Sequence, residues 1–296
     1  MKPFVLRPVF FILLLVVISA VLVTALILPA AASAWFRNLA NARIARAIAP
    51  ATDPSARIIA LNDADAQLAQ ADAWSRDDLT AFARARAFLA RDDAPRAVET
   101  FRATGDALRD DFIAQFLWAH AEYQSGDAPA AFERWRIAGA FEYFINQTQR
   151  AGFKHQWQEA EAYARIAVGI APDRADTHYY LGDAVGYQSP HDPEAMREIE
   201  RAAELAKDNP ELLATILSRQ GELLVAQGRD RDALAVFARA QQAAPRDSRP
   251  HIGYAQTLLR LDPNAKQRAV EILTQVVADA PWTIGAHLAL AQIAEA

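Results

Sequence analysis

The sequence predicts an all-α protein: a right-handed superhelical solenoid of antiparallel helix hairpins behind one N-terminal transmembrane helix. A pattern of small, large apolar and proline residues recurs about every 34 to 36 residues in the C-terminal part of the chain. A run without charged residues extends from Val9 to Leu28 and fits a membrane span. Alanine dominates the rest of the chain, and runs of β-branched residues are rare after residue 60, which favours helices over strands.

The N-terminal segment predicts a membrane anchor in residues 1–34. A cleaved signal peptide is the alternative, because Lys2 and Arg7 precede the apolar run and Ala32-Ser33-Ala34 resembles a cleavage site. The run is longer than the apolar core of most signal peptides, which favours a retained, single-pass anchor in the bacterial cytoplasmic membrane.

The sequence indicates the membrane orientation of the anchor less clearly, because basic residues lie on both sides of the Val9–Leu28 run. The order of basic start, apolar run and small residues is typical of export. It favours a cytoplasmic N-terminus and an extracytoplasmic C-terminal domain, with a cytoplasmic domain as the alternative.

Residues 35–74 are expected to form a juxtamembrane connector followed by a helix near Ala56 to Ala71. Pro50 and Pro54 interrupt the connector. Its arginines either rest on anionic headgroups or are the positive flank that accompanies any anchor.

Residues 219–245 form the clearest repeat unit. Apolar residues recur at helical intervals before and after Gly228, which predicts two helices joined by a turn. The small residues Gly221 and Ala233 allow the two helices to approach closely, while larger apolar residues fill the wider gaps. Such a hairpin cannot bury both of its apolar sides alone, so we expect a stack of hairpins. The unit is marked by Gly221, Leu224, Gly228, Ala233, Phe237, Ala240 and Pro245.

Copies of this unit extend over residues 75–296. One repeat later, Ala255, Leu258, Ala269 and Leu273 occupy the equivalent positions, and the chain finishes with "TIGAHLALAQIAEA", a half repeat or cap. Looser copies precede residue 219, with extra residues at "SPHDPEAM". The sequence therefore predicts about 5 to 6 repeats.

The pattern from Gly221 to Pro245 resembles the tetratricopeptide repeat (TPR), as in a membrane-anchored bacterial TPR protein. The resemblance covers about three quarters of the chain and implies a groove that binds a protein or peptide. In the family, the residues facing the groove lie about three before, one after and four after the small site. Carried over, these positions are Phe116, His120, Tyr123, Ile145, Gln149, Tyr179, Asp183, Ser218, Glu222, Val225, Ile252 and Gln256.

The sequence contains no recognisable catalytic motif, so we expect no enzyme activity, no cofactor and no metal. Cysteine is absent, which excludes thiolate ligands and nucleophiles. The histidines at 178, 251 and 287 each precede the small site of a repeat by four residues, which favours a packing role. The formal net charge is −5, and no basic stripe with aromatic residues is present, which argues against nucleic acid as a partner.

These observations together predict a membrane-anchored scaffold or adaptor that binds proteins or peptides and helps assemble or tether a membrane or envelope complex. The alternatives are a secreted TPR binding protein whose signal peptide is removed, and an accessory subunit of an envelope enzyme. Aromatic residues concentrate between Trp135 and Tyr163, where they form either a docking patch or an unusually bulky core.

Overall fold

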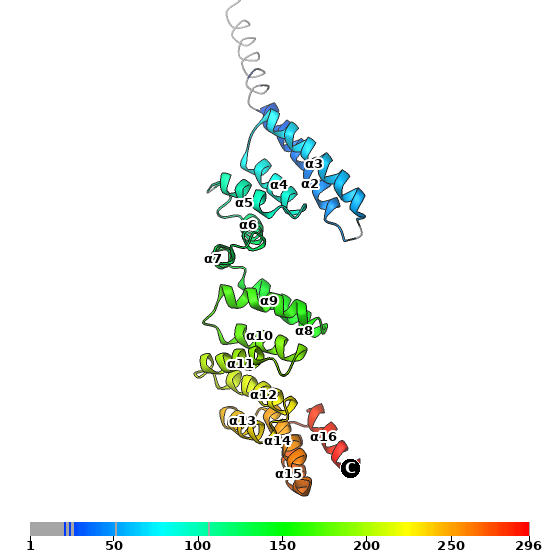
Figure 1. Cartoon of the computed structure of the whole chain (residues 1–296), viewed down its shortest axis with the longest axis vertical. Helices are drawn as coiled ribbons and strands as arrows, with labels where there is room; N and C mark the ends of the chain where they lie inside the picture. The colour runs from blue at the N-terminus through cyan, green and yellow to red at the C-terminus, as the bar shows by residue number, and fades with distance from the viewer. Residues whose placement is uncertain (1–20, 22–23, 25–26, 51, 106, 296) are drawn as a thin grey trace, which may run out of the picture. The chain divides into compact units, whose positions relative to one another are not determined.

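The computed structural model describes residues 21, 24, 27–50, 52–105 and 107–295. The chain divides into two compact units, Met1–Ala138 and Gly139–Ala296. Within each unit, consecutive helices pack as hairpins (Figure 1), and the described residues contain helices and turns but no strand. The prediction of an all-α chain built from helix hairpins is confirmed.

The predicted membrane span Val9–Leu28 lies outside the described residues except for Val21, Thr24, Ile27 and Leu28. Among the helices that the structure does describe, none combines the length and the apolar character needed to cross a bilayer. The span therefore stays a prediction.

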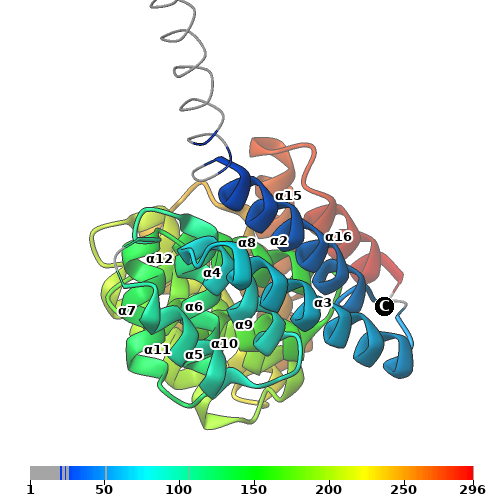
Figure 2. The same cartoon turned by 90° about the horizontal axis from the view of Figure 1, so that it is seen from above.

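The first hairpin of unit 1 consists of α2 (Leu28–Ala47) and α3 (Pro54–Trp74). The two helices lie side by side in both views (Figures 1 and 2). Ala40, Ala64 and Leu68 are fully buried in this hairpin's core. Part of the expected connector is thus helical, because small and apolar residues of α2 can pack closely against α3.

Two further hairpins complete unit 1. An aspartate precedes each of their four helices: Asp77, Asp93, Asp111 and Asp127 each accept a hydrogen bond from a backbone amide of the first turn. Phe101 is fully buried, and its ring stacks on Trp118 at a centroid distance of 5.9 Å. The helices are α4 (Asp78–Leu89), α5 (Ala94–Ala103), α6 (Phe112–Gln124) and α7 (Ala128–Ala138).

Unit 2 continues the same arrangement, with each odd-numbered helix from α9 to α15 returning beside the helix before it. The last helix, α16, packs against both α14 and α15. The elements are α8 (Phe141–Phe153), α9 (Trp157–Ile170), α10 (Ala175–Gln188), α11 (Pro193–Leu205), α12 (Pro210–Ala226), α13 (Asp230–Ala243), α14 (Ser248–Leu261), the 3-10 helix η2 (Pro263–Ala265), α15 (Lys266–Asp279) and α16 (Ile284–Glu295).

Glycines allow the close contacts between these helices. A Cβ placed at Gly182 would lie 2.9 Å from the backbone oxygen of Ala195, so α10 and α11 touch there through their backbones. At Gly221 the space is filled differently, because a Cβ there would lie 2.6 Å from Cε1 of Phe237. The glycine of the clearest repeat therefore makes room for an aromatic ring on α13.

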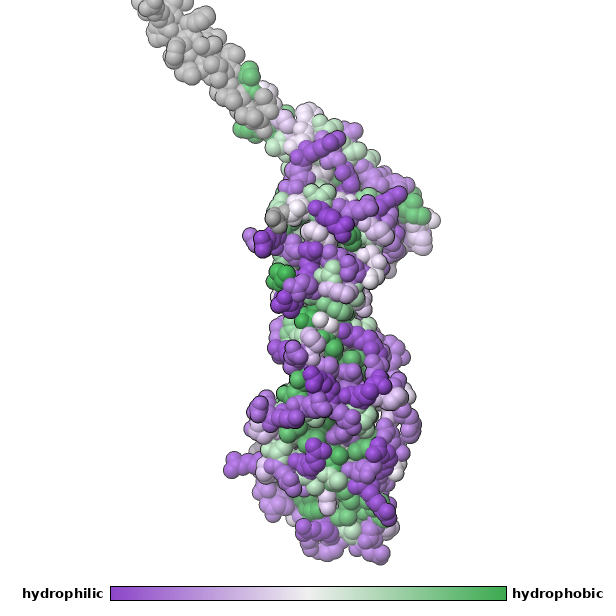
Figure 3. Space-filling model, turned by 60° about the vertical axis from the view of Figure 1, so that its left-hand side comes forward, coloured by the Kyte–Doolittle hydropathy of each residue, from purple (hydrophilic) through white to green (hydrophobic). Residues whose placement is uncertain are grey.

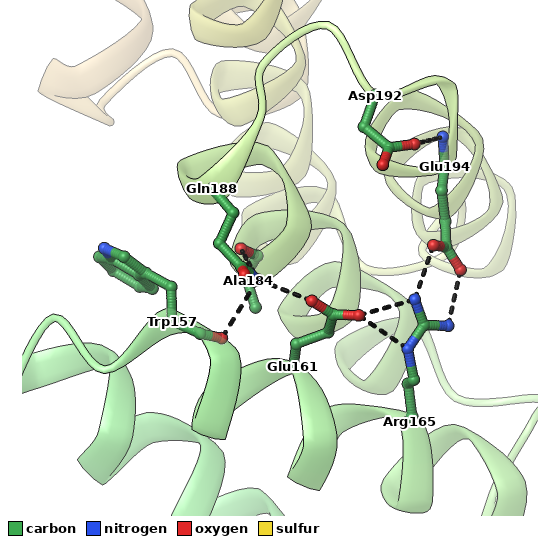
Figure 4. Close-up of polar contacts among 7 residues, drawn as sticks. All are labelled: Trp157, Glu161, Arg165, Ala184, Gln188, Asp192 and Glu194. Atoms are coloured by element: carbon green, nitrogen blue, oxygen red, sulfur yellow. Dashed lines mark hydrogen bonds and ion pairs between the residues drawn. The ribbon is translucent and has the colours of Figure 1, made fainter.

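An ion-pair network joins neighbouring hairpins on the surface of unit 2 (Figure 4). The guanidinium of Arg165 on α9 pairs with Glu161 at 2.8 Å and with Glu194 on α11 at 2.7 Å. Gln188, at the end of α10, donates a hydrogen bond of 2.7 Å to Glu161. The Asp192 carboxylate accepts a hydrogen bond from the Glu194 backbone amide at the start of α11. The segment "HDPE", residues 191–194, therefore begins a helix. The network therefore connects α9, α10 and α11.

The face shown in Figure 3 is mainly hydrophilic, with smaller hydrophobic areas between the polar residues. Isolated apolar areas of this kind are normal on a folded surface and do not mark a site.

Candidate functional site

Unit 2 contains a hollow of about 770 Å³ near its C-terminal end, lined mainly by α12, α14 and α16. We call it the C-terminal hollow. Apolar side chains of Val225, Phe237, Ile252 and Ile293 contribute to its wall. The polar part of the lining is formed by Glu222, Arg249, Gln256, Thr257, Arg260, Lys266 and Gln292.

A second hollow of about 520 Å³ is formed by α8, α9 and α10. We call it the aromatic hollow, because five of its lining side chains carry large aromatic rings. Phe153 is 87% exposed, which is unusual for a phenylalanine. The lining includes Gln149, Phe153, His155, Trp157, Tyr179, Tyr180, Asp183 and Tyr187.

Stacked rings form one wall of the aromatic hollow. Trp157 and Tyr187 are nearly parallel, with centroids 4.1 Å apart and an interplanar angle of 9°. The Arg219 guanidinium lies 4.0 Å from the Tyr187 ring centroid, so its charge faces the ring's electron-rich surface. Contacts among these three side chains therefore join α9, α10 and α12 along the wall.

Arg219 also connects the two hollows. It pairs with Asp183 of the aromatic hollow at 2.6 Å and with Glu222 of the C-terminal hollow at 3.1 Å. The Arg219 side chain is only 11% exposed. The ion pair with Asp183 joins α10 to α12, and its enclosure reduces screening by solvent.

Burial changes the titration of groups in this region. Burial raises the pKa of Asp183 above its usual range, although Arg219 opposes the shift. Burial also raises the pKa of the Tyr179 hydroxyl strongly, and the nearby charge of Asp183 adds to the effect. Tyr179 is therefore neutral at physiological pH.

Seven of the twelve groove residues predicted from the repeat register line one of the two hollows. Ile145 and Ser218 line neither hollow, and both are buried. The hydroxyl of Ser218 donates a hydrogen bond to the Ala214 carbonyl one turn earlier. The seven are Gln149, Tyr179 and Asp183 in the aromatic hollow, and Glu222, Val225, Ile252 and Gln256 in the C-terminal hollow.

The other three predicted residues lie on α6 in unit 1. Phe116 and Tyr123 contact Trp135, with ring centroids 6.0 and 5.7 Å away. His120 is half-buried, and burial lowers its pKa. These residues form an aromatic cluster of their own, and their role in binding stays a prediction.

Several lining residues were missed in the sequence. Applying the family's spacing to the small site Ala291 would have indicated Gln292, which lines the C-terminal hollow. Arg249 and Lys266 have no such signal, because they come from the first turns of α14 and α15. They place positive charge beside the C-terminal hollow.

The aromatic residues between Trp135 and Tyr163 divide between core and surface. Trp135 and Phe144 are buried, with 1% and 3% exposure, whereas Tyr143 and Phe153 are exposed. The segment therefore contributes to the core in part, and a docking role for its exposed rings stays a prediction.

Two of the three repeat histidines make the same structural contact. His178 and His287 each hydrogen bond through Nε2 to a proline carbonyl six residues earlier, at 2.8 Å in both cases. His251 instead contacts the Asp247 carbonyl through Nδ1 at 2.9 Å. These contacts hold the start of each helix to the preceding turn and agree with a packing role.

No cluster of three or more His, Asp or Glu side chains suited to a metal ion occurs in the described parts of the chain. That the protein needs neither metal nor cofactor stays a prediction.

Comparison with known proteins finds similarity in fold only. No family model and no curated protein matches the chain. A chain of the APC/C hetero-tetramer Cut9-Hcn1 is 16% identical, with a TM-score of 0.47 over 83% of this chain and 50% of that one. Yeast Tom70 is 14% identical, with a TM-score of 0.45 over 81% of this chain and 53% of its own.

The TPR protein YrrB, described as having an unusual peptide-binding site, is 20% identical, with a TM-score of 0.43 over 65% of this chain and 98% of its own. The chain spans about half the length of the Cut9-Hcn1 and Tom70 chains that it matches. At these identities and TM-scores, the matches transfer no residue role to this chain.

Proposed function

We propose that the protein is a membrane-anchored TPR-type adaptor that binds a protein or peptide segment in the hollows of unit 2. One observation carries the proposal: residues chosen only from the repeat register, among them Tyr179, Glu222 and Gln256, line two hollows of unit 2. Their convergence supports a binding surface made from the first helices of successive hairpins.

The C-terminal hollow suits an amphipathic segment. Its apolar wall, with Val225, Ile252 and Ile293, would accept apolar side chains, while Glu222 and Lys266 would meet polar groups at the rim. Its volume of about 770 Å³ lies in the range of sites that enclose a ligand. The chain's net charge of −5 favours a protein over a nucleic acid as the partner.

The anchor in this proposal is the apolar run Val9–Leu28, which would place the binding surface beside the bacterial cytoplasmic membrane, on its outer side. An adaptor held there would assemble or tether a membrane or envelope complex by binding rather than by catalysis. A cytoplasmic domain, a secreted form without residues 1–34 and an accessory subunit of an envelope enzyme are the competing outcomes.

A photo-crosslinking amino acid at Gln256 tests the binding surface in native membranes. Gln256 is exposed and lines the C-terminal hollow. Gln242 on α13 is equally exposed but lies outside both hollows, so it serves as the matched control. We expect a discrete crosslinked protein, identified by mass spectrometry, from position 256 only. Equal crosslinking from both positions would place binding elsewhere.

Because the chain contains no cysteine, single-cysteine variants can test the orientation. Thr274 is exposed on α15. We expect Thr274→Cys to react with a membrane-impermeant maleimide in spheroplasts. Reaction only after lysis would indicate a cytoplasmic domain, and a chain recovered without residues 1–34 would indicate secretion.

A further inference from the structure

One side of α2 exposes apolar and basic residues in a continuous stripe. Leu28, Trp35, Leu39 and Arg46 follow one another at intervals of seven, four and seven, which places them on the same side of a helix. Arg43 lies next to Arg46 on that side, and we call these five residues the α2 stripe. Leu28, Trp35 and Leu39 are 48%, 58% and 36% exposed, whereas the opposite side of α2 is buried in the hairpin core.

The charge of α2 contrasts with that of the whole chain. Its sequence contains three arginines and no acidic residue, in a chain of net charge −5. Arg37 is paired with Asp77 at 2.6 Å, so it is not available to a ligand. Arg43 lies 3.9 Å from Asp63 and is 45% exposed, and Arg46 is exposed with no ion pair to any described residue. The stripe therefore presents positive charge to its surroundings.

Of the three acidic residues of the neighbouring α3, only Asp63 pairs with the stripe, and the other two pair with arginines elsewhere. Asp65 pairs with Arg91 and Asp72 pairs with Arg84, each at 2.6 Å. A negatively charged surface facing the stripe would thus meet arginines that form at most one long ion pair with the protein. Most of the nearby carboxylates already pair with arginines outside the stripe.

Two exposed tryptophans lie at the same end of the α2–α3 hairpin. The Ser33 hydroxyl donates a hydrogen bond of 3.0 Å to the Ser75 carbonyl, which joins the start of α2 to the end of α3. Trp35 and Trp74, 58% and 48% exposed, are close to this bond in the sequence. Tryptophan prefers the boundary between headgroups and acyl chains. The predicted span Val9–Leu28 ends in the sequence at Leu28, the first residue of α2.

We propose that the α2 stripe lies against a bilayer surface rich in anionic lipid. Leu28, Trp35 and Leu39 enter the boundary between headgroups and acyl chains, and Arg43 and Arg46 contact lipid phosphates. The inference rests on the proposed anchor, because residues 9–28 would hold α2 at the bilayer. It goes further by assigning a lipid-binding surface to a helix and by naming the lipid charge that this surface recognises.

The test uses the full chain in nanodiscs of phosphatidylcholine, with or without an equal amount of phosphatidylglycerol. A fluorophore on Leu39→Cys reports the stripe, and one on Ala45→Cys reports the other exposed side of α2, about 120° away around the helix. A quencher attached to the lipid reports contact with the bilayer. We expect quenching at position 39, increased by phosphatidylglycerol, and little quenching at position 45.

Charge variants test the arginines. Arg43→Gln and Arg46→Gln, introduced into the Leu39→Cys chain, should each lower the docking equilibrium constant in anionic nanodiscs about fivefold, as expected for one basic residue near such a surface. Arg102 on α5 is also exposed and has no ion pair to a described residue. Arg102→Gln should therefore leave quenching unchanged.

The outcomes separate this inference from the anchor. Incorporation into nanodiscs with equal quenching at positions 39 and 45, or with no effect of phosphatidylglycerol, overturns the inference and leaves the anchor standing. Failure of the full chain to incorporate overturns both. If the fluorophore at position 39 is shielded from solvent in native membranes but is not quenched in lipid-only nanodiscs, the stripe binds a protein partner instead.

Discussion

Arg219 on α12 and Asp183 on α10 form a 2.6 Å ion pair at the boundary between the aromatic hollow and the C-terminal hollow. Both side chains are largely enclosed, with 11% and 22% exposure. Because Asp183 lines one hollow and Arg219 also reaches Glu222 in the other, the pair holds the two hollows in a fixed relation. The pair is therefore a structural support of the proposed binding surface.

Arg219→Leu should lower the free energy of unfolding by about 2 kcal/mol at pH 7, since it leaves Asp183 enclosed without its cation. Burial already raises the pKa of Asp183, and loss of Arg219 would raise it further. The folded state then binds a proton more tightly than the unfolded state, so stability falls as pH rises through the folded pKa and recovers below it. The deficit should thus shrink as the pH is lowered from 7 into the acid range.

Denaturant unfolding of the detergent-solubilised full chain, with hydrogen exchange to locate the change at α10 and α12, checks this prediction. Arg239→Leu on α13 is the control, because Arg239 is exposed and has no ion pair to a described residue. A loss in the free energy of unfolding that does not change with pH would mean that Asp183 stays charged in the folded variant.

Gly221→Ala should destabilise unit 2 by about 1–3 kcal/mol, because its Cβ would lie 2.6 Å from Cε1 of Phe237. Phe237→Leu should also destabilise, by leaving a cavity. The double variant should cost less than the sum of the two, because the smaller side chain gives the new methyl group room. Thermal unfolding followed by tryptophan fluorescence measures this coupling.

Gly285→Ala is the matched control for Gly221→Ala. Its Cβ would lie 3.4 Å from Ile252, an ordinary contact, and alanine favours a helix more than glycine does. It should be neutral or stabilising. Strict additivity of Gly221→Ala and Phe237→Leu would contradict the contact between these residues.

Phe153→Ala should leave stability nearly unchanged, since the side chain is 87% exposed. It should weaken capture of the partner about tenfold or more if the aromatic hollow takes part in binding, because large exposed aromatic residues often dominate interfaces. Titration of the crosslinked partner against the variant measures the loss. Trp282→Ala, which removes an 80% exposed aromatic residue outside both hollows, should bind normally. Equal binding by both variants would exclude the aromatic hollow.

Arg165→Gln should cost no more than about 1 kcal/mol, because its ion pairs with Glu161 and Glu194 lie near the surface. The hydrogen bonds from Arg165 lower the pKa of Glu194. A lowered pKa contributes stability that is present above the unfolded value and is lost as pH falls through the folded pKa. Unfolding measured from pH 7 to pH 3 should show the difference between wild type and variant disappearing in acid. A difference that persists there would assign the cost to packing.

Much of the fold follows from local signals in the sequence. Proline after Asp192 and Asn209 marks helix starts that the structure confirms, because these side chains accept hydrogen bonds from the first-turn amides. The residues Ala233, Phe237 and Ala240, taken from the repeat pattern, are all buried between paired helices. Helix capping and repeat spacing depend on residues a few positions apart, so they can be recognised in a single sequence.

The repeat register predicted only part of the candidate site. The register identified Glu222 and Gln256 but also included Ile145 and Ser218, which neighbouring helices bury. A register specifies the side of a helix, whereas exposure depends on how closely the next hairpin packs against that side.

Local signals in the amino-acid sequence specify that this protein is built from helices, where its hairpins turn and which small residues lie between them, because helix capping and periodicity act over a few residues. Three other features depend on the packing of the folded chain: Arg219 meets Asp183, Phe237 occupies the space beside Gly221, and α16 closes the C-terminal hollow. Those contacts join residues from different helices, and their geometry is set by the packing of whole hairpins.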